Sequence, residues 1–524
     1  MSKRPELGIA RTEAGARPAR SDAPVAPRPL ALALAAALGL ASGSAPAMPV
    51  AQARAVLSAA TPAAPLPTRP QGAILWVVEN CNDAGPGSLR NAAQHANDGD
   101  GIDLSALTCS TISVTSGAIN LPDVILTGPG ADVLSIDGIN NENHRIFNHS
   151  SSGGTLTIKD LTISRGKYTS NQGLGGGCLR SSGGNVVLEN TKFSSCGVVT
   201  PLGANGNARG GAIAAYGSGY LEMHEVMITG SFARTDHGVA YGGAVYAQGH
   251  LQILASTISN NNTSASGVGA TVAGGGLFTR SSAWIDSSTI DGNTSAGAGG
   301  GGVFEHGGHL TNSTVSNNDA IDGASAIAFL GGASATTTIA NSTISGNTTE
   351  RSAQGASGAL FVNTYEAAIY DSTITANDET NGLGTRYGAG IVIGSGIGNF
   401  ALHNSIVSGN YFHDDVTPSL AADIVGPSFL DVSASTNLIG WSSITIPPPT
   451  IWTTDPLLGP LQDNGGWTPT HMPLPGSPAI DHGFSLPRRW DQRSQRREAG
   501  TAADIGAVET GTTVIFRDDF DMGS

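Results

Sequence analysis

The sequence is poor in charged and aromatic residues and shows no helical periodicity. Of its 524 residues, 13% are charged and 5% are aromatic, whereas glycine occurs 72 times. This composition argues against disorder and against long helices. The formal net charge is -15, so we expect no nucleic-acid partner. The largest basic group after residue 47 lies beside Asp491 and Glu498, where it predicts a solvated, internally paired loop; it consists of Arg488, Arg489, Arg493, Arg496 and Arg497.

Residues 1–47 have the pattern of an export signal. Six basic residues precede an apolar run from Leu30 to Leu40, and Ala45-Pro46-Ala47 offers a small-residue cleavage site. The run is too short for a membrane-spanning helix, and no later segment is a better candidate. We therefore expect an exported protein, extracellular or at the bacterial cell surface or outer membrane, with no transmembrane segment in its mature chain. Residues 48–75 are expected to form an Ala/Pro-rich linker.

Only four cysteines are present, a number that suits two disulfides in an exported protein. Sequence proximity favours Cys81 with Cys109 and Cys178 with Cys196, although three connectivities are formally open. A metal site is the alternative, but no CxxC motif or Cys/His cluster supports it. No cofactor is expected, and calcium stays an open alternative without a nonapeptide motif to hold it.

One short pattern recurs about every thirty residues. Residues 256–261 read STISNN, residues 342–347 read STISGN and residues 372–377 read STITAN. A second apolar residue stands five positions before each central one. Since a single repeat cannot bury its apolar face, stacked repeats predict an all-β, right-handed parallel β-helix of about nine coils. The central apolar residues of these coils are Ile163, Phe193, Ile228, Ile258, Ile290, Val315, Ile344, Ile374 and Val407.

An asparagine stands three residues after the central apolar residue in six consecutive repeats. When coils stack about 4.8 Å apart, like residues at a bend can form a ladder of hydrogen-bonded amides. The predicted ladder consists of Asn261, Asn293, Asn318, Asn347, Asn377 and Asn410.

The repeats also carry glycine-led strands such as Gly242-Gly243-Ala244-Val245. Together with the Ile/Phe-x-x-Asn corner, these strands resemble the repeats of polymorphic outer membrane proteins and of right-handed parallel β-helix proteins generally. The resemblance covers residues 151–411 and implies the fold. It implies no single activity, because this fold hosts pectate lyases, glycoside hydrolases, adhesins and passenger domains.

Residues 76–150 are expected to hold an N-terminal cap and the first strands. Gly87-Ser88-Leu89-Arg90 is similar to an opening found before many bacterial β-helices, with Ser88 as the N-cap of a short helix that ends near Asn97. Residues 412–454 are expected to form the C-terminal cap or connection.

Residues 455–509 resemble the choice-of-anchor Q domain, a module that precedes sorting or anchoring tails. The motifs that carry this resemblance include Asp455-Pro456-Leu457-Leu458, Asn464-Gly465-Gly466 and Ser477-Pro478-Ala479-Ile480-Asp481. The glycine usual after Asp491-Gln492-Arg493 is Ser494 here. The tail, residues 510–524, has no apolar anchor and no sortase motif.

The outer surface offers one candidate ligand patch, and we assign no catalytic residue. Trp284 and His309 occupy the same outward position on adjacent coils, with Asp286 beside them, which predicts a small sugar-stacking patch. The alternative is a solvated sheet face. A stack of aromatic residues is instead expected to be a core ladder; it consists of Tyr246, Phe278, Phe304, Phe329 and Phe361.

These observations favour an exported, non-catalytic adhesion protein that binds a glycan, a matrix component or another cell surface. The first alternative is a polysaccharide lyase or glycoside hydrolase of the same fold, which would need carboxylates or basic residues that converge in one groove. The second alternative is a passive structural protein of the envelope.

Overall fold

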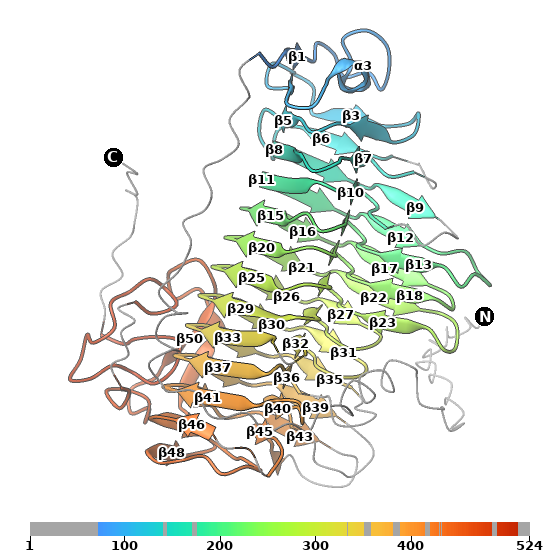
Figure 1. The fold of residues 1–524 in the computed structure, drawn as a ribbon. Coiled ribbons are helices and arrows are strands. Elements are labelled where there is room, and N and C mark those ends of the chain that lie inside the picture. Colours follow the sequence, from blue (N-terminus) through green and yellow to red (C-terminus); the bar gives the residue numbers. More distant parts are fainter. Residues whose placement is uncertain are drawn as a thin grey trace, which may run out of the picture.

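The computed structural model describes residues 72–511 except 140–143, 170–174, 333, 351–357, 381–387, 414–419, 429, 431 and 485–489. These residues form an elongated parallel β-helix in which each coil lies on the one before it (Figure 1). The predicted export signal, nearly all of the predicted linker and most of the tail lie outside the described residues. Within the described range, no helix is long and apolar enough to cross a bilayer.

Each coil passes through four stacked columns of short strands. Column I contains β1 (Leu75–Val77), β2 (Gly101–Asp103), β5 (Ile125–Thr127), the first half of β8 (Thr155–Ser164), the first half of β11 (Asn185–Ser194), β15 (Leu221–His224), β20 (Leu251–Leu254), β25 (Ala283–Asp286), β29 (Gly307–Thr311), β33 (Thr336–Ala340), β37 (Glu366–Tyr370), β41 (Asn399–His403) and β46 (Val432–Ala434). Column II contains β3 (Thr111–Ser113), β6 (Ser135–Asp137), the second halves of β8 and β11, β16 (Met227–Thr229), β21 (Thr257–Ser259), β26 (Thr289–Asp291), β30 (Thr314–Ser316), β34 (Thr343–Ser345), β38 (Thr373–Thr375), β42 (Ile406–Val407), β47 (Asn437–Ile439) and β48 (Thr450–Trp452).

The other two columns complete the coil. Column III contains β9 (Lys167–Thr169), β12 (Gly197–Val199), β17 (Phe232–Thr235), β22 (Asn262–Ala265), β27 (Thr294–Ser295), β31 (Asp319–Ala320), β35 (Thr348–Thr349), β39 (Asp378–Thr380), β43 (Tyr411–His413) and the antiparallel β44 (Leu420–Ala421). Column IV contains β4 (Ile119–Leu121), β7 (Phe147–Ser150), β10 (Leu179–Ser182), β14 (Ile213–Tyr216), β19 (Val245–Ala247), β24 (Leu277–Thr279), β28 (Gly302–Phe304), β32 (Ile327–Leu330), β36 (Leu360–Asn363), β40 (Ile391–Ile393) and β45 (Ile424–Val425).

A small sheet and a short helix accompany the four columns. A three-stranded sheet of β13 (Asn207–Arg209), β18 (Val239–Tyr241) and β23 (Thr271–Ala273) flanks columns III and IV. Helix α3 (Leu89–His95) covers the N-terminal end (Figure 1), and the Ser88 hydroxyl accepts a hydrogen bond from the Asn91 amide, as predicted. The helix ends at His95, slightly before the expected Asn97.

Column IV has eleven strands, which correspond to about eleven coils rather than the predicted nine. The additional coils come from the segments that flank the repeats. Strands β1, β2, β4 and β5 stack in register with the coils that follow, but their sequences lack the Ile-x-x-Asn corner. The count of nine relied on apolar residues five positions apart, whereas the stacked core residues of the first coils lie ten positions apart, as Ile102 and Ile112 do.

A continuous hydrophobic core fills the inside of the solenoid. Parallel register places Ile228, Ile258 and Ile290 directly above one another, and all three are buried. The stack is possible because the chain turns sharply through left-handed backbone at each bend. Ala255, with φ 47°, lies between columns I and II, and Asn260, with φ 55°, lies between columns II and III.

Buried asparagines join the coils at the second bend. Asn261 Nδ2 donates to Asn293 Oδ1 at 2.9 Å, and each later asparagine repeats this bond to the next coil. The stack ends where Asn410 Nδ2 donates to Asp423 Oδ1 at 2.7 Å. Every ladder amide also satisfies a backbone carbonyl, as when Asn293 Nδ2 donates to the Ile258 carbonyl. The ladder thus supplies the hydrogen bonds that water would otherwise make to these fully buried amide groups.

A second polar ladder occupies the first bend, and the sequence analysis did not identify it. The Ser256 amide donates to the Ser288 hydroxyl at 3.0 Å, and the pattern continues until the Ser405 amide donates to Asn437 Oδ1. Its signal is a serine two residues before the central apolar residue. The members are Ser256, Ser288, Ser313, Ser342, Ser372 and Ser405.

The structure confirms both predicted disulfides. Cys81 pairs with Cys109 near the N-terminal cap, with Cα atoms 6.5 Å apart, and Cys178 pairs with Cys196 inside the solenoid, with Cα atoms 5.6 Å apart. Cys178 and Cys196 are completely buried, whereas Cys81 and Cys109 are partly exposed.

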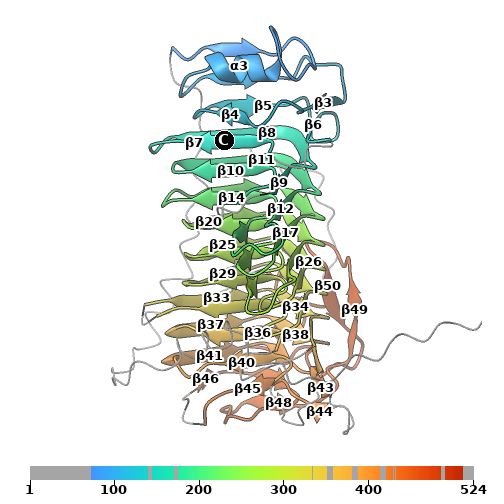
Figure 2. The same ribbon diagram turned by 90° about the vertical axis from the view of Figure 1, so that its right-hand side faces the viewer.

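The segment from residue 455 to residue 511 leaves the solenoid and packs along the outer face of column II. Its antiparallel hairpin, β49 (Leu458–Gln462) and β50 (Thr470–Pro473), runs beside the stack in Figure 2. His471 Nε2 lies 2.8 Å from the Ser345 hydroxyl, and the Ala507 amide donates to the Thr373 hydroxyl. Column II is therefore covered on its later coils.

The expectation of a solvated arginine loop was wrong for two of its members. Arg493 and Arg497 are buried within this C-terminal segment. Arg493 pairs with Asp491 at 2.8 Å, and Arg497 donates to Asn341 Oδ1 on the solenoid. The arginines are enclosed because the segment folds back on column II, which the local sequence does not indicate.

Candidate functional site

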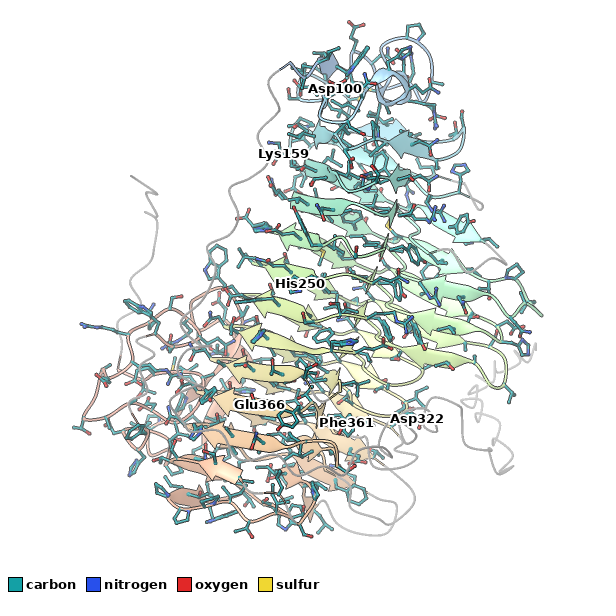
Figure 3. All side chains as sticks on the ribbon, viewed as in Figure 1. Asp100, Lys159, His250, Asp322, Phe361 and Glu366 are labelled. Atoms are coloured by element: carbon teal, nitrogen blue, oxygen red, sulfur yellow. A yellow bond between two sulfur atoms is a disulfide. The ribbon has the colours of Figure 1, made fainter. Side chains whose placement is uncertain are left out.

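The outer face of column I carries two rows of side chains, which are partly exposed on the middle coils, whereas Thr338, Ala340 and Tyr370 on the later coils are buried. In Figure 3, Lys159, His250 and Glu366 mark this column from its earlier to its later coils. One row includes Glu222, Gln252, Trp284, His309 and Thr338. The neighbouring row includes Glu189, His224, Leu254, Asp286, Thr311, Ala340, Tyr370 and His403.

Trp284 and His309 lie together in the middle of this face. Their ring centroids are 5.2 Å apart, with the rings tilted by 38°. Burial lowers the pKa of His309, and the nearby His250 lowers it further. The imidazole is therefore neutral at neutral pH, so the two rings form one uncharged aromatic surface.

Asp286 lies beside this pair but is occupied within the protein. Its Oδ1 accepts hydrogen bonds from the Thr311 hydroxyl at 2.6 Å and from Asn312 Nδ2 at 2.8 Å. These bonds hold the bend of the next coil. We therefore infer that Asp286 supports the aromatic pair by holding Thr311 and Asn312 in place.

Tyr370 and His403 form a second aromatic pair on later coils of the same face. Their centroids are 5.3 Å apart and the rings are nearly parallel. Burial lowers the pKa of His403, which also leaves this imidazole neutral. Tyr370 is only 8% exposed, so it offers little surface to a ligand, whereas His403 is partly exposed.

The earlier coils of the face bring ionisable residues together. Register places Lys159, Glu189 and His224 on three successive coils. His224 Nε2 lies 2.7 Å from Glu222 Oε1, and this hydrogen bond raises the pKa of His224. Burial raises the pKa of Glu189, whose Oε1 has no hydrogen-bond partner among the described residues. Hydrolases use a carboxyl with a raised pKa as general acid and a second carboxylate as base or nucleophile, and Glu189 and Glu222 are residues of these two kinds.

The outer face of column IV differs from what the sequence predicted. Tyr246 and Phe278 lie in register on this outer face, whereas Phe304 and Phe329 lie in the next register row and point into the main core. The five aromatic residues are therefore not a single core ladder. Gly302 stands opposite Leu277, so Val303 follows Phe278 in the outer row. A shift of one residue moves a side chain to the opposite face of a strand.

Tyrosines and arginines gather on the earlier coils of this same outer face. Tyr216 and Tyr246 have ring centroids 5.5 Å apart. The guanidinium of Arg180 lies 5.8 Å from the Tyr216 ring centroid, and that of Arg209 lies 5.3 Å from the Tyr246 centroid. Tyr241 stacks on Phe278 at 4.1 Å. Within the described part of the chain, there is no group of three or more His, Cys, Asp or Glu side chains that could hold a metal.

Comparisons with known proteins add little to this geometry. No family model matches the chain, and no curated protein matches it. Among solved structures it is similar to tailspike protein 3 of bacteriophage CBA120, with 13% identity and a TM-score of 0.24. The match covers 68% of this chain and 58% of the tailspike, so the chain spans less than two thirds of that neighbour. A likeness this distant carries no inference about activity.

Proposed function

We propose that the protein is an exported, non-catalytic β-helix that binds a glycan along the outer face of column I. The observation that carries this proposal is the partly exposed pair of Trp284 and His309, whose ring centroids lie 5.2 Å apart with the rings tilted by 38°. Flat, uncharged aromatic surfaces fit the apolar faces of sugar rings. The glycan would belong to an extracellular matrix or another cell surface.

Export and retention belong to the same proposal. Two disulfides suit an oxidising environment outside the cytoplasm, in agreement with the signal-like residues 1–47. We assign residues 151–411 to polymorphic-type repeats and residues 455–509 to a choice-of-anchor Q module. In this assignment the module packs against column II, while Trp284 and His309 on column I stay partly exposed to a ligand.

Affinity electrophoresis in gels that contain neutral or acidic polysaccharides tests the binding proposal. Trp284→Ala should reduce retardation in the gel that slows the wild type, because it removes the larger ring of the pair. Trp452→Ala is the matched control, since Trp452 is an exposed tryptophan on the last strand of column II. Equal retardation of wild type and Trp284→Ala would remove column I from the binding role, and no retardation in any gel would favour a passive structural protein.

A glycoside hydrolase is the second candidate, favoured by Glu189 beside the Glu222–His224 pair. In that reaction the protonated Glu189 would donate a proton to the leaving oxygen, and Glu222 would act as base or nucleophile. The test is whether the wild type releases new reducing ends from a polysaccharide and whether Glu189→Gln and Glu222→Gln abolish this release. That result would establish the hydrolase and contradict the non-catalytic assignment. Glu366→Gln, on a later coil of column I, is the control.

A further inference from the structure

Two arginines, Arg180 on β10 of column IV and Arg209 on β13 of the flanking sheet, lie beside the tyrosines of column IV. Nε of Arg180 and Nε of Arg209 are both buried without a hydrogen-bond partner among the described residues. Neither guanidinium forms an ion pair with a described carboxylate, unlike Arg280, which pairs with Glu305 at 3.0 Å. A buried guanidinium N–H group without a hydrogen-bond partner is costly. Its presence in a chain with a net charge of -15 is the feature to be explained.

The two cations act on one small area. Arg180 lies on β10 beside Tyr216, and Arg209 lies on β13 in register with Tyr241. Burial raises the pKa of the Tyr216 hydroxyl, and the charges of both arginines also act on this hydroxyl. Tyr216 and Tyr241 are partly exposed, whereas Tyr246 beneath them is buried. The area thus has a buried aromatic floor, two partly exposed tyrosines and two arginines that form no ion pair with a carboxylate of the described residues.

A third arginine increases the positive charge of this area. The buried Arg145 stacks 3.8 Å from the Tyr168 ring centroid. It donates to the Gly176 carbonyl, the Gly175 carbonyl and Asn148 Oδ1, none of which is charged. Burial is the main cause of its lowered pKa, and the charge of Arg180 contributes to it. These bonds satisfy Arg145 and hold it in place, so Arg180 and Arg209 remain the two cations available to a ligand.

We propose that Arg180 and Arg209 form a binding site for an acidic saccharide, whose anionic group they bind while its ring lies against Tyr216 and Tyr241. Guanidinium groups pair with carboxylate and sulfate oxygens through two parallel hydrogen bonds. The partly exposed tyrosines supply the aromatic surface that a sugar ring requires. The anionic group is either the carboxylate of a uronate or a sulfate ester. This site lies on a different column from Trp284 and is independent of the function proposed for column I.

Binding measurements with matched probes test the site. Polygalacturonate supplies carboxylates, dextran sulfate supplies sulfates, dextran is the neutral control and poly-glutamate represents an acidic peptide. The full chain and its Arg180→Gln, Arg209→Gln and double variants are titrated with each probe at low and high salt. Arg234→Gln is the matched control, because Arg234 also lies over an aromatic ring, Phe232, but is exposed on column III.

The double variant should lose about tenfold or more in affinity for one acidic polysaccharide, as expected for a lost charge-assisted contact. Wild-type binding should weaken in salt, and Arg234→Gln should bind as the wild type does. Preference for polygalacturonate would identify a uronate, and preference for dextran sulfate a sulfated sugar. The melting temperature of the double variant should be unchanged or slightly raised, since two buried Nε–H groups without hydrogen-bond partners are removed.

Three results would overturn this proposal. They are wild-type affinity in the double variant, no binding of either acidic polysaccharide by the wild type, and tighter binding of poly-glutamate than of both polysaccharides. Trp284→Ala separates the two sites: it should leave binding at Arg180 and Arg209 unchanged even where it abolishes binding at column I.

Discussion

Gln492 Nε2 donates a hydrogen bond to the Thr314 hydroxyl at 2.8 Å, although the two residues are 178 positions apart in the chain. The same side chain accepts from the Thr343 hydroxyl at 2.7 Å on the next coil. Gln492 therefore ties the C-terminal segment to two coils of column II at once. Through these two bonds the C-terminal segment contributes to the stability of the solenoid.

Gln492→Ala should destabilise the protein by about 2–3 kcal/mol, because it leaves the buried Thr314 and Thr343 hydroxyls without these partners. Denaturant unfolding followed by circular dichroism measures the change. Gln495→Ala, three residues away and only partly buried, should change the unfolding free energy by under about 0.5 kcal/mol. Similar effects of the two variants would contradict the role given to Gln492.

Asn318→Ala should cost about 3 kcal/mol of unfolding free energy, because it removes a fully buried link in the middle of the asparagine ladder. Asn318 Oδ1 accepts from the amide and side chain of Asn293, and its Nδ2 donates to Asn347 Oδ1. Asn262→Ala, which removes one partly buried bond to Thr294, should cost under about 1 kcal/mol. A loss at Asn318 as small as that at Asn262 would show that the ladder adds little.

The two disulfides should differ in their resistance to reduction. Cys81 and Cys109 are partly exposed, so a mild thiol reductant should open this bond in the folded protein. Cys178 and Cys196 are fully buried and should react only in denaturant. Alkylation followed by peptide mass spectrometry distinguishes the four thiols. Equal reduction rates under native conditions would rule out this difference in access.

Acid should loosen the C-terminal segment through His471. Its Nδ1 lies 2.7 Å from the Gly459 carbonyl, so Nδ1 carries the proton and Nε2 accepts from the Ser345 hydroxyl. Burial lowers the pKa of His471 below its ordinary value of 6.5. Below pH 6.5 the unfolded state therefore binds more protons than the folded state. The free energy of unfolding falls with pH until the pH drops below the folded-state pKa.

Hydrogen exchange of residues 458–473 at pH 7 and pH 5 measures this loosening. After correction for the slower intrinsic exchange at lower pH, the protection factors of the wild type should be smaller at pH 5 than at pH 7. His471→Gln should reduce the difference between the two pH values, since Gln does not titrate in this range. His482→Gln is the control, because His482 is exposed and contacts only the Ile480 carbonyl. A pH effect that persists unchanged in His471→Gln would assign it to other groups.

Much of the solenoid could be predicted because stacked coils repeat their sequence. The spacing of Ile258 and Asn261 identified the core position and the second bend, and the pairing of Cys178 with Cys196 followed from proximity. The first coils were missed because their core residues, such as Ile102 and Ile112, lie ten positions apart rather than five. The aromatic residue Phe304 was placed on the wrong row because one glycine shifts the register of β28.

The candidate surfaces were harder to predict than the coils. Trp284 and His309 share a repeat position, so their neighbourhood could be inferred, whereas Arg180 and Arg209 lie on different columns and share none. Their common position beside the stacked tyrosines depends on the lengths of loops between strands. Periodicity gives no information about such loops.

The sequence by itself determined the repeating coil, because period-two apolar strands, left-handed bends and buried amides are local properties that each repeat specifies. Only the tertiary structure decided which outer faces remain open. The C-terminal segment covers column II through contacts such as Gln492 with Thr314, and bends bring Arg180 and Arg209 to one area of column IV. These arrangements depend on packing between residues far apart in the chain, which no repeat encodes.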